Sequence, residues 1–246
     1  MPLFVQALLI AILAGLAQMD SRIFGQNLID RPLVTGSIVG LILGDFQTGI
    51  IVGASLELVW LGIVNIGGAT PPDVISGGIL GTAFAIIGGF DTETAIAVAM
   101  PIALLAQSLG ILIRIINTGL NHRADVHAAK GNDKGVDRIL YTGAILFFLF
   151  ASVPVFFGVF FGAEAVGTLV AAIPERILYG MRMSAGILPA LGMAILMRFI
   201  YDKTTAPFLF IGFVMSAILG MSMISISIVG AAVAYAIFRG SIRQSL

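Results

Sequence analysis

Four polar residues interrupt an apolar stretch, RPLVTGSIVGLILGDFQTGIIVGASLELVWLGIVNIGGATPPD (residues 31–73): Asp45, Glu57, Asn65 and Asp73. Carboxylates accept hydrogen bonds, and a primary amide both donates and accepts them. Together these groups suit a ligand rich in hydroxyl groups, such as a sugar, better than a metal ion or a lone anion. The pattern therefore indicates a binding site for a small polar molecule inside an apolar protein.

Glu57 is the strongest candidate because it lies on a helical face that is otherwise bare. Gly49, Gly53 and Glu57 recur every four residues, and residues at this spacing share one face of an α-helix. Rows of small residues in membrane helices allow a second backbone to approach closely. A carboxylate on such a face points into protein, where its burial is costly unless it has a partner. We therefore assign Glu57 to the substrate site, with a structural ion pair to Arg22 or Arg31 as the alternative.

The segment NIGGATPPD predicts a break in the helix that carries Glu57. Its glycines and prolines cannot continue a helix, so backbone groups become available to a ligand. Asn65, Gly67, Gly68 and Asp73 are accordingly assigned to the substrate site. Asp73 has a second interpretation, because an aspartate directly before an apolar run is a typical N-cap.

Gly44 and Asp45 are interpreted as scaffold. Gly36, Gly40 and Gly44 form a second row at intervals of four residues, and Asp45 follows in the short segment DFQT. An aspartate at this position typically forms an Asx turn. The structural part of the motif thus consists of Gly44, Asp45, Gly49 and Gly53.

The composition places these residues in a membrane protein. The chain is 59% hydrophobic and 11% charged, with a mean hydropathy of +1.07, whereas soluble domains carry about 25% charged residues. Thirteen basic and thirteen acidic residues cancel, which gives no electrostatic basis for binding nucleic acid. Because cysteine is absent, disulfides, thiolate metal sites and cysteine nucleophiles are excluded. We expect neither a cofactor nor a metal.

The apolar runs predict an all-α polytopic membrane protein. A spanning helix needs about 20 apolar residues. Segments near this length are 3–19, 74–90, 94–116, 139–162 and 184–200. The first has no basic segment before it and exceeds a signal-peptide core, so we expect it to be retained as a membrane helix.

Two pairs of apolar runs are too short for ordinary spans. These are 33–44 with 49–64, and 206–220 with 221–238. Short pairs at corresponding positions are typical of the broken or re-entrant helical hairpins of transporters. They raise the hypothesis of two inverted halves, 1–116 and 139–246, although no residue-level repeat is visible. Two shortened spans in a thinned bilayer are the alternative for each pair.

The longest polar stretch, residues 117–138, is interpreted as a loop that joins the halves of a single membrane domain, 1–246. Together with Arg114 it contains five basic residues, so the positive-inside rule places it in the cytoplasm. His122 and His127 are interpreted as solvated side chains. We therefore expect neither histidine to accept a phosphoryl group.

The stretch from Arg31 to Asp73 resembles the signature of the IIC membrane subunit of the mannose-fructose-sorbose family of phosphotransferase sugar transporters. The matching elements are the Arg-Pro opening, Gly-Asp-x-x-x-Gly from Gly44 to Gly49, Glu57, NIGGA and the closing Pro-Asp. Looser similarity extends over the whole chain, including AIPERILYGMRMSAGILPALG at 172–192 and FLFIGFV at 208–214.

This resemblance implies a sugar-translocating subunit that is not itself an enzyme. Such a subunit carries no phosphoryl-accepting residue and no catalytic residue of its own. It lies in the bacterial inner membrane and pairs with a homologous IID subunit, and a trimer of IIC–IID heterodimers is expected. The sugar, a hexose or amino sugar, is carried inward and phosphorylated by cytoplasmic IIB, which receives phosphate from IIA. A core that moves relative to a scaffold would fit an elevator-type cycle.

Two other functions agree with parts of the sequence. An ion-coupled secondary transporter of a small polar solute would use Glu57 as the acid whose protonation gates transport. It would work without IID or phosphorylated IIB. An intramembrane aspartyl protease would need two facing aspartates, but Asp45 and Asp202 lack the Gly-x-Gly-Asp spacing of that family.

Overall fold

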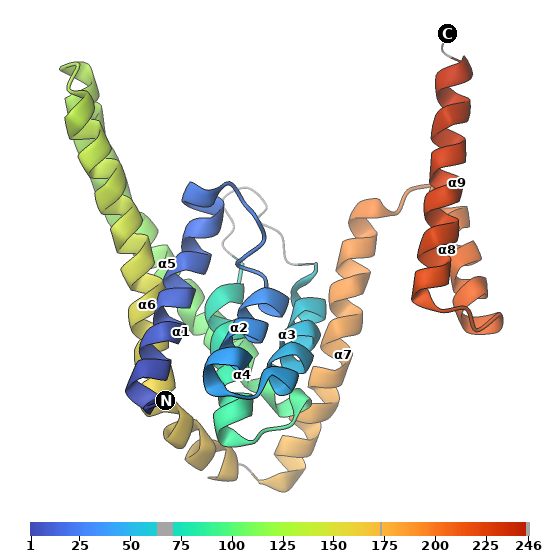
Figure 1. The fold of residues 1–246 in the computed structure, drawn as a ribbon, viewed down its shortest axis with the longest axis horizontal. Helices are drawn as coiled ribbons and strands as arrows, with labels where there is room; N and C mark the ends of the chain where they lie inside the picture. The colour runs from blue at the N-terminus through green and yellow to red at the C-terminus, as the bar shows by residue number, and fades with distance from the viewer. Residues whose placement is uncertain (63–70, 173, 245–246) are drawn as a thin grey trace. The chain divides into compact units, whose positions relative to one another are not determined.

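The computed structural model describes residues 1–62, 71–172 and 174–244, and within these ranges it contains helices and turns but no strand (Figure 1). The predicted all-α class is therefore confirmed for the described residues. The helices are α1 Leu3–Met19, η1 Asp20–Phe24, α2 Pro32–Leu43, α3 Phe46–Trp60, α4 Val74–Gly88, α5 Thr92–Ala129, α6 Asp133–Ala172, α7 Glu175–Ile200, α8 Ala206–Phe213, η2 Val214–Ile218 and α9 Met223–Gln244. The chain forms two compact units, Met1–Leu196 and Met197–Leu246.

In the described part of the chain, three helical segments are long and apolar enough to cross a membrane by length and composition: Leu3–Phe24, Thr92–Ala129 and Asp133–Gly162. The predicted span 74–90 is shorter in the structure, where α4 has 15 residues. A helix of this length extends about 22 Å and does not cross an apolar core about 30 Å thick. Gly89 ends this helix in the left-handed region, at φ 65°.

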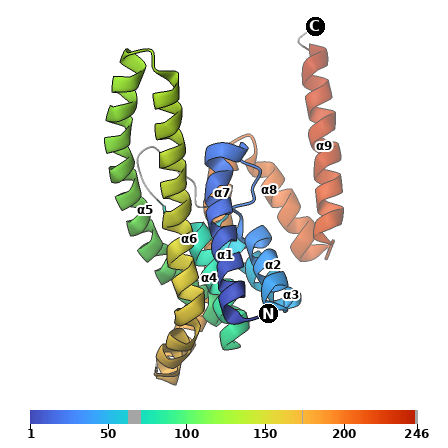
Figure 2. The same cartoon turned by 60° about the vertical axis from the view of Figure 1, so that its left-hand side comes forward.

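Helix α4 is the centre of the first unit, where it packs against α1, α2, α3, α5 and α6 (Figures 1 and 2). Eleven of its residues are buried. On one side Ile79 joins a cluster with Ile10 and Val155. On the other side Trp60, fully buried, covers the backbone at Gly77. Because lipid is as apolar as these side chains, close packing stabilises such contacts more than transfer from water does.

Helices α2 and α3 form a hairpin whose two glycine rows face each other. A Cβ added to Gly36 would lie 2.9 Å from the Cα of Gly53, and one added to Gly40 would lie 2.9 Å from the Cα of Gly49. Gly44 ends α2 with φ at +89°, a conformation that a side chain would strain. The predicted close approach of a second backbone is confirmed, and the partner backbone is that of the neighbouring helix.

The prediction of a loop conformation for residues 117–138 is wrong, because most of this stretch is helical. Helix α5 continues to Ala129 and α6 begins at Asp133. Gly131 turns the chain at φ 63°, and Asn132 accepts the backbone N–H of Gly135 at 3.0 Å. Polar residues that favour helix can extend a membrane helix into water, so polarity alone did not identify a loop. With 38 residues, α5 extends about 57 Å, well beyond the apolar core.

The later helices also differ in length from the sequence prediction. Helix α6 continues to Ala172 instead of ending at 162, and α7 begins at Glu175 instead of 184. Gly192 of α7 packs so closely against the end of α3 that a Cβ would collide with the Leu58 carbonyl oxygen. In the second unit, the predicted pair 206–220 and 221–238 corresponds to α8 with η2, followed by α9.

Candidate functional site

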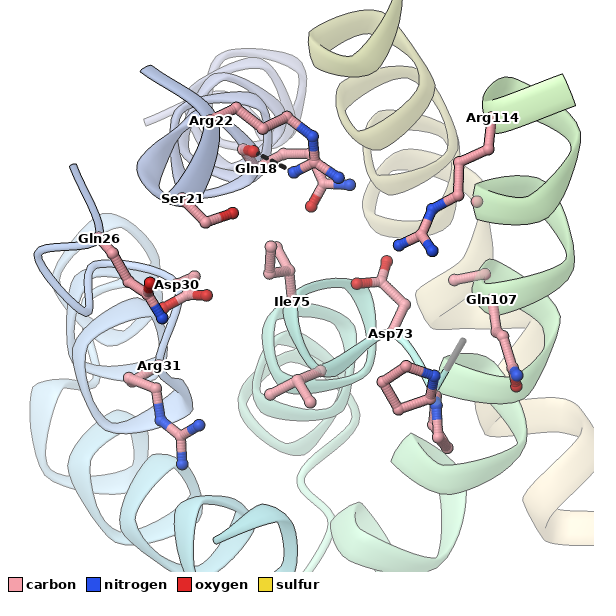
Figure 3. Close-up of a pocket in the computed structure, with 15 residues that line it drawn as sticks. Gln18, Ser21, Arg22, Gln26, Asp30, Arg31, Asp73, Ile75, Gln107 and Arg114 are labelled. Carbon is pink, nitrogen blue, oxygen red and sulfur yellow. Dashed lines mark hydrogen bonds between the residues drawn. The ribbon is translucent and has the colours of Figure 1, made fainter. Parts of the chain in front are cut away.

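A polar cavity of about 280 Å³ lies where the end of α1, the loop before α2, the start of α4 and the middle of α5 meet (Figure 3). Its volume is close to the lower end of the range for small-molecule sites, about 300–1,000 Å³. The polar residues that line it are Gln18, Ser21, Arg22, Gln26, Asp30, Arg31, Asp73, Gln107 and Arg114.

The end of α1 supplies the first group of lining residues. The helix continues without a break into the π-helix η1, a form that often occurs at functional sites. Arg22 donates from Nη1 to the Gln18 carbonyl oxygen at 2.6 Å. Its guanidinium lies over the Phe147 ring of α6, 4.2 Å from the ring centre, in a favourable cation–π arrangement. These contacts hold Arg22 at the cavity.

Asp73 occupies the N-cap position of α4, and its carboxylate is directed toward the cavity (Figure 3). Its backbone N–H donates to the Ala103 carbonyl oxygen of α5 at 3.0 Å. The Ser76 hydroxyl donates to Oδ2 at 2.6 Å. Arg22 and Arg114 point toward this carboxylate from opposite walls (Figure 3). Asp73 therefore stands at the start of α4, as one interpretation of the sequence predicted, but its side chain makes no capping hydrogen bond. It also lines a polar cavity, whereas its contact with a ligand stays a prediction.

Glu57 does not line this cavity; it forms an ion pair with Arg31, which does. The Glu57 Oε1 atom lies 2.7 Å from Arg31 Nε and 2.5 Å from Nη2. The Leu33 backbone N–H donates to Oε2 at 3.4 Å. This is the structural pairing with Arg31 that the sequence left open as an alternative. A direct contact between Glu57 and a ligand stays a prediction.

The other predicted site residues fall into two groups. Asn65, Gly67 and Gly68 lie outside the described residues, although Pro71 and Pro72, which follow them, line the cavity. Asp45 caps α3, since its carboxylate accepts the Thr48 N–H at 3.0 Å and the Thr48 hydroxyl at 2.6 Å. The scaffold residues Gly44, Asp45, Gly49 and Gly53 all lie in the α2–α3 hairpin.

Sequence reasoning did not single out most of the residues that line the cavity. The available signal was position: Gln18, Ser21 and Arg22 cluster at the end of the first apolar run. Gln107 is an amide inside the apolar run 94–116, where a polar side chain has few alternatives to a protein or ligand partner. Their convergence could not be predicted, because it depends on how α1, α4 and α5 pack.

Comparison with known proteins decides the family. The family model of the sorbose-specific IIC component of the phosphotransferase system (PTS) matches residues 4–236. The chain belongs to this family. The sorbose-specific EIIC component of Lacticaseibacillus casei is 34% identical over 92% of this chain and 82% of its own length. For the mannose-specific EIIC component of Escherichia coli K12, the identity is 32% over 93% of this chain and 86% of the relative.

Solved structures agree with this assignment to the IIC family. A structure described as a membrane protein has a TM-score of 0.86 at 30% identity, covering 96% of this chain and 95% of the other. The cryo-EM structure of the mannose transporter ManYZ with microcin E492 contains a chain with a TM-score of 0.62, at the same identity and coverage. The predicted resemblance is confirmed. The chain is a membrane transport component of a sugar PTS, a permease subunit and not its phosphorylated carrier.

Proposed function

We propose that the polar cavity binds the sugar that this IIC subunit carries across the membrane. The observation that supports this most strongly is the balance of its lining. Arg22 and Arg114 are matched by Asp30 and Asp73, while Arg31 is paired with Glu57 outside the lining. Amides and a hydroxyl complete the wall. A neutral ligand with many hydroxyl groups can donate hydrogen bonds to the carboxylates and accept them from the guanidiniums. A bare cation would pair only with the carboxylates, and a bare anion only with the guanidiniums.

The proposed ligand is a hexose or amino sugar. Relatives of the chain are named for sorbose, mannose, fructose and N-acetylgalactosamine. These sugars share a small ring or chain dense in hydroxyl groups, which suits a cavity of about 280 Å³. Asp73 is a proposed ligand contact, and we retain Asn65, Gly67 and Gly68 in the proposed site.

The subunit is proposed to work in the bacterial inner membrane with a IID partner. The related mannose transporter was solved as the ManYZ complex. In the second unit, an apolar groove of about 640 Å³ runs along α8 and α9, and residues 206–238 include no charge. Such a surface requires lipid or an apolar partner. A trimer of IIC–IID heterodimers, with IIB and IIA in the cytoplasm, is the assembly that we propose.

The hairpins suggest how the cavity is oriented. Helix α5 continues from Arg114 to Ala129 toward the tip of the α5–α6 hairpin (Figure 2), a further distance of about 22 Å. If the basic tip is cytoplasmic, the cavity lies on the side where IIB would phosphorylate the sugar. We further propose that α2–α3 is a re-entrant hairpin and that α8–η2 with α9 is its counterpart in an inverted half.

The experiment measures binding of radiolabelled mannose, fructose, sorbose and N-acetylgalactosamine to the purified IIC–IID complex. Gln107→Ala and Asp73→Asn should each weaken binding about tenfold to a hundredfold, the effect of a lost hydrogen bond in a buried site. The control is Asp45→Asn, because Asp45 lies outside the cavity lining. Unchanged affinity in both cavity variants, with the complex intact, would contradict the proposal.

A second measurement separates this function from ion-coupled secondary transport. Liposomes containing the IIC–IID complex should accumulate sugar phosphate only when phosphorylated IIB is supplied. Uptake by the IIC chain alone, driven by an ion gradient, would support the secondary transporter instead.

A further inference from the structure

The loop between η1 and α2 has an unusual backbone. Gln26 has φ at 63° and Leu28 has φ at 65°, both in the left-handed region that non-glycine residues seldom adopt. Conformations of this kind persist only where surrounding contacts impose them, and they cluster at functional sites. The same short loop brings Gln26, Asp30 and Arg31 to the cavity wall.

Asp20 supplies the contacts that impose this conformation. Its side chain is fully buried and does not line the cavity. Oδ1 accepts the backbone N–H of Asn27 at 3.0 Å, and Oδ2 accepts that of Ile29 at 3.1 Å. The Asp20 carbonyl oxygen also accepts the Gln26 N–H at 3.0 Å. The residues bonded in this way include or adjoin both left-handed positions, so one carboxylate fixes the path of the loop.

We propose that Asp20 is a positioning residue of the sugar site, and that the loop it holds sets the affinity for the sugar and the choice among sugars. This rests on the proposed function of the cavity. A loop fixed before the ligand arrives loses little freedom on binding, which favours affinity. A fixed backbone at Gln26 also limits the positions that its amide can reach, so the amide can bond hydroxyl groups in only some configurations. Sugars that differ at one carbon are distinguished in this way.

Asp20→Asn is the direct test. The amide retains one acceptor oxygen but places an NH₂ group against the second backbone N–H, so one of the two bonds is lost. We expect binding of the preferred sugar to weaken about tenfold. The ratio of affinities between the most tightly and the most weakly bound of the four radiolabelled sugars should also decrease. The matched control is Asp202→Asn, because Asp202 likewise accepts backbone N–H groups, those of Thr204 and Thr205, and does not line the cavity.

Rescue separates positioning from a general contribution to folding. Asparagine adopts positive φ more readily than leucine, so Leu28→Asn lowers the strain that Asp20 sustains. Leu28 is exposed and does not line the cavity. In the Asp20→Asn background, Leu28→Asn should restore part of the affinity and of the selectivity. If the lost affinity reflected only weakened global folding, Asp20→Asn would leave the ratio of affinities between sugars unchanged. The double variant would then recover thermal stability and the binding of all sugars in parallel.

Gln26→Ala tests the same proposal without altering Asp20. It removes the amide from the cavity wall while both carboxylate bonds to the loop remain possible, and it should reduce affinity with an unchanged unfolding temperature. This variant decides the matter if Asp20→Asn fails to assemble. Wild-type affinity ratios in Gln26→Ala, or in an assembled Asp20→Asn, would overturn the proposal. If Gln107→Ala and Asp73→Asn also bind normally, the cavity itself is not the sugar site and the proposed function fails first.

Discussion

Arg31 joins the cavity to the α2–α3 hairpin. Arg31 is one of the residues that line the cavity, and its guanidinium is held by Glu57 of α3. The Glu57 carboxylate also accepts the Leu33 N–H in the first turn of α2, where backbone donors lack partners within the helix. Glu57 therefore stabilises the start of one helix from another, and it fixes the orientation of a cavity residue without lining the cavity.

Glu57→Gln should weaken this ion pair while retaining the shape of the side chain. The two side chains are 25% and 17% exposed, so partial solvation limits the loss to about 1–2 kcal/mol of unfolding free energy. Sugar affinity should decrease too, because Arg31 loses its fixed orientation. Thermal unfolding and sugar binding of the detergent-purified complex measure both effects. A double-mutant cycle with Arg31→Gln supplies the control, since additive effects would show that the two residues do not act together.

Asp30 should give sugar binding a pH dependence. Burial, and next the neighbouring carboxylate of Asp20, raise the pKa of Asp30 above its ordinary value. A raised pKa in the folded protein means that the folded state binds the proton more tightly, so this residue's contribution to stability falls as the pH rises through the range between its unfolded and folded pKa values. On acidification Asp30 should become neutral before an ordinary aspartate, and it then ceases to be a carboxylate acceptor.

We therefore expect sugar affinity to decline as the pH is lowered, starting above the ordinary aspartate range. The measurement is a binding titration at a series of pH values for the wild type and Asp30→Asn. The variant should bind more weakly at neutral pH and show a smaller acid-dependent decline, because Asp73 is then the remaining carboxylate of the cavity lining. An identical pH profile in both proteins would exclude Asp30 as its origin.

At the scale of elements, the glycine spacing was the most informative feature of the sequence. The interval of four residues predicted faces where a second backbone approaches, and the packing of α2 on α3 has that form. The bounds of α1 also agree with the predicted segment 3–19. The polar tip of α5–α6 was assigned wrongly, because a solvated helix and a solvated loop have similar compositions, and hydrophobic periodicity cannot separate them.

Gly49→Ala should destabilise the α2–α3 hairpin. The added methyl group would lie 2.6 Å from the Gly36 carbonyl oxygen and 2.7 Å from the Gly40 Cα, so two backbones must move apart. Overpacking of this kind costs about 1–3 kcal/mol. The control is Gly119→Ala in α5, where the new methyl group would meet no atom within 4 Å beyond its own turns of helix backbone, and where alanine stabilises a helix relative to glycine. The unfolding temperature should therefore fall for the first variant only, and equal shifts would contradict the packing explanation.

At the scale of the whole molecule, a short sequence signature predicted the family, but the sequence did not predict the cavity. The signature lies within residues 31–73, which a sequence presents directly. The cavity combines the end of α1 with the middle of α5 and the start of α4, and such a meeting depends on tertiary packing. Of the predicted site residues in the described part of the chain, Asp73 lies in the cavity lining, and Glu57 forms an ion pair with the lining residue Arg31.

The long α5–α6 hairpin makes the orientation of the subunit testable. Helix α5 exceeds the apolar core by about 27 Å, so its two ends must lie on opposite sides of the membrane if it spans. The chain contains no cysteine, so single-cysteine variants can be made directly in the native sequence. Asn132 lies exposed at the hairpin tip, and Glu93 lies exposed at the other end of α5.

We expect Asn132→Cys to react with a membrane-impermeant maleimide in inside-out vesicles and not in intact cells, because the basic residues of the tip favour the cytoplasm. Glu93→Cys should show the opposite pattern, which makes each variant the control for the other. Labelling of Asn132→Cys in intact cells would show the opposite topology, with the cavity on the side of the membrane away from the proposed cytoplasmic IIB. Labelling of both variants from the same side would show that α5 does not span the membrane. The expected pattern would place the proposed sugar cavity on the cytoplasmic side of the apolar core, the side on which we propose that IIB phosphorylates the sugar.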